Sequence, residues 1–406
     1  MSTEATQPVP SAVKPRIIQP PPRDSTAKGY ISFHHPHYRF PTGLLLSLVR
    51  FDEEILQDVL VSGVHHETAL IACQIIAGNI FHTGYLALDQ AGQQRIDTPL
   101  DGLLTENVYF FIIQGNDKYP IVPSFRDWSF PHHGLPDIWT TNPVSQLPGS
   151  RPNTCAITGD SYAIDRAHII PREEDSWYNN VGMPYYGGDI NNPTNFLPLR
   201  KDLRKCFDDR WFVIIPKRPG NTSQHKYMTH ILPASAADIW PTYQNIIVQG
   251  LCQNSNAYLF ARFAWAIFQQ VKLFMTTGFD RNVIRFEWDQ CNTSTSYKEE
   301  TLEGSQLKAL YGGGGSKSAT PMKRNFREAF EDIEGSVYEN SVGYSGSDVD
   351  AEEFWDGKTG EIGGNMGSKR REQSSSETLP EEVYGELKTS ATALVTSQHT
   401  REASIE

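Results

Sequence analysis

The chain has 406 residues, of which 38% are hydrophobic and 11% aromatic, and its formal net charge is −12. This much apolar material can fill the core of one large domain or two smaller ones, which excludes a chain that is disordered throughout. The net negative charge argues against a protein that binds nucleic acid with its whole surface. The charge is uneven, however, because residues 196–218 carry seven basic side chains against three acidic ones. That local excess could contact a polyanion.

The cysteines indicate neither a disulfide framework nor a zinc knuckle. They are odd in number, widely spaced and free of C-x-x-C pairs, which is typical of a reducing compartment. The N-terminus lacks the apolar core of a signal peptide. The most apolar stretch, 258–279, is interrupted by Arg262 and Lys272, which argues against a membrane span. We therefore expect an intracellular protein with no membrane contact, and the sequence leaves the choice between nucleus and cytoplasm open.

Both ends of the chain are predicted to be disordered. Residues 1–28 form a polar lead-in that is rich in proline. Residues 291–406 are rich in serine, glycine and glutamate, and from residue 301 onward there are 11 basic and 19 acidic side chains. This acidic tail is a candidate contact for protein partners.

The folded region between these ends divides into three parts. Residues 29–150 are predicted to form an N-terminal α+β part, with a helix within 65–81 and a buried strand over 107–114. Residues 221–290 are predicted to form a helical extension, with helices near 234–250 and 256–276. The central part lies between these two.

The central part, residues 151–220, carries the side chains that suggest chemistry. Here "CAITG" ends in a turn, "YAIDRAHIIP" predicts a short strand, and "RWFVIIPK" predicts a strand closed by proline. The segment "LPLRKDLRKCFDDRWF" predicts a helix, because its apolar residues recur at spacings of three and four and its basic residues lie opposite. The apolar face comprises Leu199, Leu203, Cys206 and Phe207. The expected order is strand, strand, loop, helix, strand.

Four short patterns arrive in order over residues 155–217: C-x-x-T-G, A-H-I-I-P, N-x-L-x-L-R-x-D-L and F-D-x-x-x-F-x-I-x-P-K. Together they resemble the HNH endonuclease domain of a group of fungal proteins, and the likeness extends over about residues 30–290. The resemblance implies a ββα-metal (HNH) core embedded in a larger α+β domain. That fold agrees with the order of elements predicted above.

The resemblance also implies an activity and its site residues. Hydrolysis of a phosphodiester needs a base that deprotonates water and a cation that neutralises charge on the phosphate. By resemblance His168 is the base, and a histidine suits this task because its pKa lies near neutrality. Asn195 matches the asparagine that holds the loop and the base in register. A final histidine on the helix would hold a divalent ion, Mg²⁺ or Zn²⁺.

The chain departs from the family pattern at the metal position. Arg204 stands where the helix histidine is expected, and a guanidinium has no lone pair with which to bind a metal. Ala167 stands where many such nucleases place another ligand. Any metal would then depend on Asp208, one helical turn beyond Arg204, with Asp165 or Asp202 as helper.

Three hypotheses follow. In the first, the protein is a metal-dependent HNH endonuclease with an ion at Asp208 and Asp165. In the second, catalysis is lost and the module binds nucleic acid, with DNA favoured over RNA, or a protein. That binding would use the basic residues Arg200, Lys201, Arg204 and Lys205. In the third, the protein has a structural or regulatory role, and His168 is a core residue.

Overall fold

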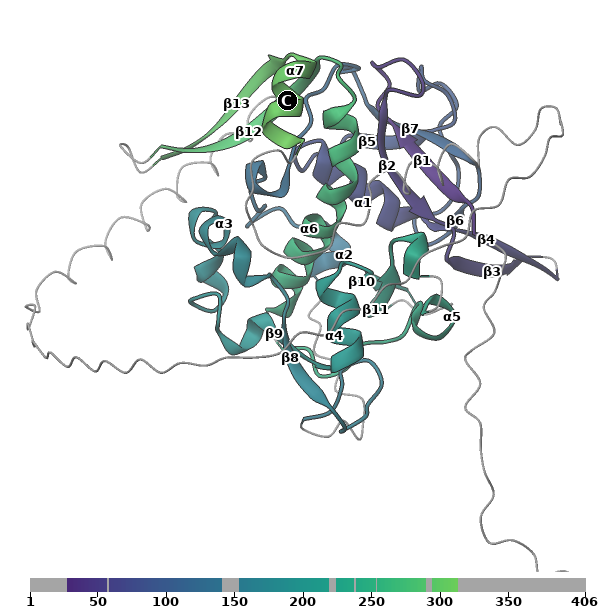
Figure 1. The fold of residues 1–406 in the computed structure, drawn as a ribbon. Coiled ribbons are helices and arrows are strands. Elements are labelled where there is room, and N and C mark those ends of the chain that lie inside the picture. Colours follow the sequence, from purple (N-terminus) through teal and green to yellow (C-terminus); the bar gives the residue numbers. More distant parts are fainter. Residues whose placement is uncertain are drawn as a thin grey trace, which may run out of the picture. The chain divides into compact units, whose positions relative to one another are not determined.

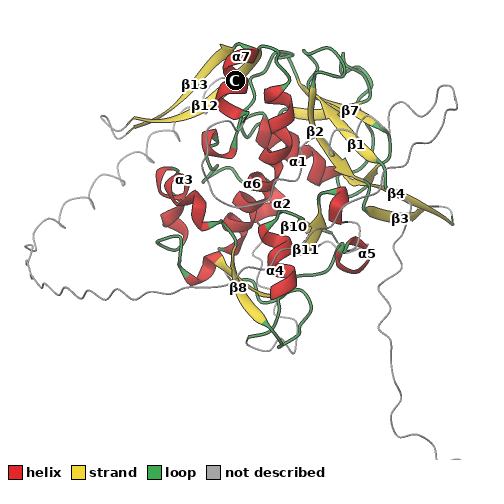
Figure 2. Cartoon of the chain, viewed as in Figure 1, coloured by secondary structure: helices red, strands yellow, loops and turns green. Residues whose placement is uncertain are grey.

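The computed structural model describes residues 28–56, 58–140, 153–218, 224–236, 239–252, 254–289 and 294–312 (Figure 1). The expected lead-in up to residue 27 and the expected tail beyond residue 312 lie outside these residues, so the disorder of both ends stays a prediction. The described residues mix helices with strands, which confirms the α+β class (Figure 2).

A four-stranded sheet dominates the N-terminal part. Its strands, in spatial order, are β2 (Leu44–Val49), β1 (Tyr30–His34), β7 (Val108–Ile113) and β5 (Gly84–Ala87). The β1 strand is antiparallel to β2 and parallel to β7, and β5 is antiparallel to β7. Helix α1 (His66–Ile76) contacts β2 and β5 and is buried over most of its length. The predicted strand over 107–114 is confirmed by β7, and α1 lies within the range predicted to be helical.

A second sheet is built on a hairpin. Strands β3 (Asp52–Leu56) and β4 (Val59–His65) pair antiparallel from Asp52↔Gly63 to Leu56↔Val59. Strand β6 (Leu103–Leu104) pairs with Val64 and His65 alone, at the end of β4. Gly63 is required here, because a Cβ at this position would lie 2.4 Å from the Leu104 carbonyl oxygen.

The central part contains a two-stranded ribbon followed by a helix. Strand β8 (Ile164–His168) pairs with β9 (Phe196–Arg200), and helix α4 (Lys201–Asp208) starts directly after β9. Helix α3 (Asp175–Asn180) lies between the two strands in sequence. Strand β10 (Phe212–Lys217) follows α4 and pairs with β11 (Lys226–Ile231).

The predicted helix over the segment "LPLRKDLRKCFDDRWF" begins later than expected. Leu197 and Leu199 lie in β9, where alternation places both in the core, and only Leu203 and Phe207 share the buried face of α4. A spacing of four between Leu199 and Leu203 is compatible with a strand that passes into a helix, and the sequence pattern alone did not separate the two.

Helix α6 (Ser255–Thr276) lies at the centre of the core. It contacts β2, β10, α1 and α2 (Asp137–Thr140), and sixteen of its residues are buried. This confirms the helix predicted over 256–276. None of the helices in the described ranges combines the length and apolarity needed to span a bilayer.

Two boundaries predicted for the C-terminal part are corrected. Among the described residues of the helix predicted near 234–250, the structure has only a 3₁₀ turn at Ala234–Ala236 and the short helix α5 (Trp240–Tyr243). The chain also stays ordered past residue 290, because β12 (Arg281–Asp289) pairs with β13 (Ser294–Leu302), and α7 (Gly304–Tyr311) packs on α6. Polar composition concealed these elements, since a ribbon exposed on one face needs few apolar residues.

A buried ion pair joins the N-terminal part to β10. The Lys217 ammonium donates to Asp52 Oδ1 at 2.6 Å, to Asn245 Oδ1 at 2.8 Å and to His230 Nδ1 at 3.0 Å. The other carboxylate oxygen, Asp52 Oδ2, accepts the backbone N–H of His65 at 3.0 Å. Burial alone would raise the pKa of Asp52, but the adjacent Lys217 charge and the neighbouring histidines outweigh it and hold the pKa well below its usual range.

Stability is expected to fall as the pH is lowered from about 6.5 toward 4. Burial, and secondarily the Lys217 charge, lowers the pKa of His65 and of His230 from 6.5 to about 3. Between these values the unfolded chain binds more protons than the folded chain, so acid favours unfolding, by up to roughly 3 kcal/mol per histidine at pH 4. Urea unfolding followed across this pH range checks it.

The control for this experiment is a histidine that folding does not bury. His230→Gln should flatten the dependence of unfolding free energy on pH, whereas the same change at the exposed His82 should leave the slope as it is. A stability that does not change over this pH range would contradict the burial of neutral imidazoles in the network.

Candidate functional site

The β8–β9 ribbon presents two different faces. Strand pairing runs from Ile164↔Arg200 to His168↔Phe196, and successive side chains point to opposite sides. Ala167 is fully buried on the side of α4, whereas Arg166 and His168 lie on the other side with Phe196. The ribbon therefore carries the predicted base on its more exposed face.

His168 is the last residue of β8 and is half-buried. Its Nε2 lies 3.2 Å from Asn191 Oδ1, where an Nε2–H can donate to the amide oxygen. Its ring centroid lies 4.3 Å from that of Phe196, and the Arg166 guanidinium lies 4.1 Å from the Phe196 centroid. Neither Asn191 nor Arg166 carries a periodic signal in the sequence that would distinguish it from other residues of its type.

Asn195 is fully buried and joins the two segments that flank the site. Its Oδ1 accepts the N–H of Ile170 at 2.8 Å, and its Nδ2 donates to the carbonyl oxygens of Ile190 at 2.8 Å and Ile170 at 3.2 Å. The backbone carbonyl of Asn195 also accepts the N–H of Ile169 at 2.8 Å. The amide thus ties the residues just after His168 to the loop that carries Asn191.

Two tyrosines, Tyr178 and Tyr258, make hydrogen bonds to the loop that carries Asn191. Asn192 Nδ2 donates to Tyr258 Oη at 3.0 Å, and Tyr178 Oη donates to the Gly188 carbonyl at 2.9 Å. Burial, together with the neighbouring Tyr258 hydroxyl, raises the pKa of Tyr178, so its hydroxyl remains a donor. A Cβ at Gly187 would lie 2.8 Å from Asn192 Oδ1, so a larger residue there would displace that side chain.

Arg204 lies between two carboxylates. Its Nη1 is 2.5 Å from Asp165 Oδ2 on β8, and its Nε is 3.4 Å from Asp208 Oδ2 on its own helix. The backbone N–H of Arg166 and the Arg204 guanidinium lower the pKa of Asp165, so this carboxylate stays ionised. All three side chains are between 35% and 47% exposed, so the ion pairs are in contact with solvent.

The residues present do not fit the metal centre that the resemblance implies. Asp165 and Asp208, the expected ligands, both face a guanidinium, which carries a permanent positive charge and has no lone pair to donate. Over the described ranges, no three side chains of the His, Cys, Asp or Glu types gather in a way that could hold an ion. These side chains therefore do not support a catalytic step through a metal ion.

Three of the four basic residues predicted to bind nucleic acid, Arg200, Arg204 and Lys205, make ion pairs with described residues. Arg200 contacts Asp202 Oδ2 at 2.7 Å and Asp160 Oδ2 at 2.8 Å, and Lys205 pairs with Asp209. Residues 155–217 contain eight basic and nine acidic side chains, so the unit as a whole is close to neutral. Lys201 is exposed and makes no ion pair with a described residue. The sequence predicted a basic surface on this helix, but carboxylates compensate the charges of Arg204 and Lys205, and only Lys201 has no such partner among the described residues.

A buried arginine from α6 joins the ends of β8 and α4. The Arg262 guanidinium donates to the carbonyls of Ile169 and Phe207, and it stacks 3.9 Å from the Phe207 ring centroid and 4.3 Å from that of Trp265. Burial lowers the pKa of Arg262 to about 9, so it remains charged at neutral pH. The sequence analysis used Arg262 only as an argument against a membrane span.

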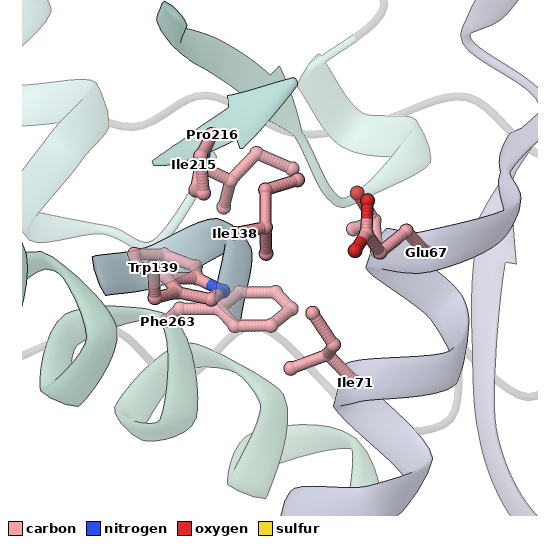
Figure 3. A pocket seen from close by; sticks show the side chains of 8 residues that line it. Glu67, Ile71, Ile138, Trp139, Ile215, Pro216 and Phe263 are labelled. Atoms are coloured by element: carbon pink, nitrogen blue, oxygen red, sulfur yellow. The ribbon is translucent and has the colours of Figure 1, made fainter. Parts of the chain in front are cut away.

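A small cavity lies where α1, α2, β10 and α6 meet, and it is apolar apart from Glu67 and Thr68. Figure 3 shows Trp139, Ile138 and Phe263 on one side of this space and the carboxylate of Glu67 on the other. Its volume is about 10 Å³, which is room for no more than one water molecule. A nucleotide cannot enter it.

Asn195→Leu should destabilise the protein by about 3 kcal/mol, because it leaves the N–H of Ile170 and the carbonyls of Ile170 and Ile190 buried without partners. Denaturant unfolding measures this loss. The control is Asn191→Ala at the exposed neighbour, which should cost less than about 1 kcal/mol. Equal losses in the two variants would contradict the bracing role of Asn195.

Comparison with known proteins gives one result for the ribbon and helix. Residues 155–215 match the family model described as HNH endonuclease, a stretch that includes β8, β9 and α4 and ends before Arg262. The chain matches no curated protein and no solved structure. Residues 155–215 of this protein are therefore similar to the HNH endonuclease family.

Proposed function

We propose that this HNH-type domain binds nucleic acid through phosphate contacts, without a resident metal ion and without cleaving the backbone. The observation that carries the proposal is the position of Arg204, whose guanidinium pairs with both Asp165 and Asp208. The resemblance implies a divalent metal ion at this position, which can dissociate. Here the position holds the guanidinium of Arg204, which is part of the chain. DNA is the favoured ligand, as the sequence analysis expected.

The guanidinium of Arg204 at the expected ligand position argues against metal-dependent cleavage. His168 alone could supply general-base catalysis, which typically contributes about 10²–10⁴-fold. Enzymes reach roughly 10⁶–10¹⁷-fold, and phosphate esters are among the slowest substrates. The remaining factor needs charge stabilisation of the phosphate and the departing oxygen. Arg204 is a poor source of it, because two carboxylates already compensate its charge.

Two cations without an acidic partner among the described residues, Arg166 and Lys201, support phosphate binding. Arg166 and Lys201 are exposed and make no ion pair with a described residue. Arg166 lies over Phe196, beside His168, so a cation, an aromatic ring and an imidazole share one face of the ribbon. Arg204 can also exchange Asp208 for a phosphate oxygen at low cost, because solvent-exposed ion pairs typically contribute only about 0–1 kcal/mol.

The binding test uses a labelled DNA duplex and fluorescence anisotropy in the presence of EDTA. If three phosphates are contacted, affinity should fall about 40-fold between 50 and 200 mM salt, because log affinity changes by about 0.9 per contact and per log unit of salt. Arg166→Ala and Lys201→Ala should each weaken binding and reduce this slope by about one contact. Lys308→Ala, a distant exposed cation on α7, is the control.

Two results would contradict binding at this surface. The first is an affinity that depends on added metal. The second is a complete lack of binding at low salt, which would favour the structural hypothesis.

Arg204→His should convert the site into a metal site. An imidazole between Asp165 and Asp208 supplies a third donor, so Zn²⁺ or Mg²⁺ should raise the melting temperature of this variant and not of the wild type. Metal-dependent nicking of plasmid DNA should appear with it, and adding His168→Ala should lower that nicking about 10²–10⁴-fold. Lys205→His, one residue along α4, is the matched control and should gain neither property.

The same assay can overturn the proposal. If the wild-type chain nicks plasmid DNA with added metal and loses this activity in His168→Ala, the first hypothesis, an active nuclease, is correct.

A further inference from the structure

The β3–β4 hairpin exposes an unusual amount of apolar surface. Ile55 is 70% exposed, Val59 61% and Leu60 59%, and all three lie near the same turn. Ile55 and Leu60 are directly paired across the strands, whereas Val59, one residue from Leu60, points to the opposite face. The hairpin thus shows apolar side chains on both faces, where a sheet of an isolated protein normally buries one.

Two ion pairs anchor the base of this hairpin. Asp52, the first residue of β3, is in the buried ion pair with Lys217. Next to it, Glu53 pairs with Lys28 at 2.5 Å, and Lys28 also donates to Ser62 Oγ at 3.1 Å. The anchored base holds the apolar end in a defined position without covering it. Figure 1 shows the hairpin extending beyond the four-stranded sheet.

The outer edge of β3 is open to another strand. Sheet order places β3 beside β4 alone among the described strands, so its outward N–H and C=O groups have no strand partner there. Alternate residues of an antiparallel edge direct these groups outward, and an open edge of this kind can accept an extended segment.

The negative charge of the β3–β4 hairpin favours a segment with positively charged side chains. Glu54 and Asp58 are exposed, and neither makes an ion pair with a described residue. A second copy paired edge to edge would bring Glu53 and Glu54 of both copies together, and like charges that face each other across strands are destabilising. A heterologous segment with cationic side chains between apolar ones avoids this repulsion.

We propose that the β3–β4 hairpin is a docking site for an extended segment of a protein partner, one that adds to the outer edge of β3 and combines lysine or arginine with β-branched residues. Main-chain pairing supplies the register, Ile55 and Leu60 supply apolar contact, and Glu54 supplies charge recognition. The proposal does not depend on nucleic-acid binding by the HNH-type domain.

The test uses the full chain and two fluorescent peptides, one alternating lysine with valine and the other alternating glutamate with valine. The lysine peptide should bind and the glutamate peptide should not. The double variant Ile55→Ser/Leu60→Ser should weaken binding at least about tenfold, because two apolar contacts are lost. Leu310→Ser on α7 is the matched control, since Leu310 is 59% exposed, like Leu60.

Two further arms separate charge from main-chain pairing. Glu54→Lys should weaken binding of the lysine peptide and strengthen that of the glutamate peptide. A lysine peptide with N-methylated backbone should lose binding, because it cannot donate to the β3 edge. The proposal is overturned if neither peptide binds, if both bind equally, or if the Ile55 and Leu60 variant binds as the wild type does. A dimer that the same variant dissociates would assign the hairpin to self-association instead.

Discussion

The ion pair between Arg204 and Asp165 is the interaction that connects the ribbon to helix α4 in this domain. It links Asp165 on β8 to α4, so ribbon and helix are held together by a charge that the chain itself provides. Arg262 makes a second link, by hydrogen bonds to the carbonyls of Ile169 and Phe207, between the end of β8 and the end of α4. A metal ion between ribbon and helix would supply both cross-linking and charge. Here two arginines supply the cross-linking, and most of the charge at Arg204 is compensated.

The HNH-type domain is also tied to the rest of the chain by buried charges. The family match ends at residue 215, yet Lys217 pairs with Asp52 of the N-terminal part and Arg262 reaches the domain from α6. The Arg262 guanidinium satisfies the buried carbonyls of Ile169 and Phe207, and a buried carbonyl left without a partner typically costs about 1–3 kcal/mol. A fragment cut at the limits of the match would lose Arg262. The anchored Asp52 also fixes the base of the β3–β4 hairpin, so one ion pair supports both the domain and the proposed docking site.

Much of the framework could be predicted because its signals are local. The long apolar helix over 256–276 and the strand over 107–114 follow from periodicity. The family resemblance assigned His168 and Asn195 to one module, and in the structure His168 contacts Asn191 while the Asn195 side chain contacts Ile170 and Ile190. Elements with weak local signals were missed. Leu199 looked helical because its spacing to Leu203 fits both a helix and a strand that joins one, and β13 with α7 were hidden in a polar segment.

The sequence by itself determined the type of domain, the identity of the residue at the metal position and the absence of a lone pair there, because these are properties of residue types at fixed spacing. Tertiary structure decided what those residues do. Only folding brings Asp165 and Asp208 to the same guanidinium, sets Asn191 beside His168 and pairs Asp160 with Arg200 across 40 positions of sequence. Electrostatic interactions depend on the distance between charges in space. A sequence pattern gives only the separation along the chain, so it does not predict these pairs.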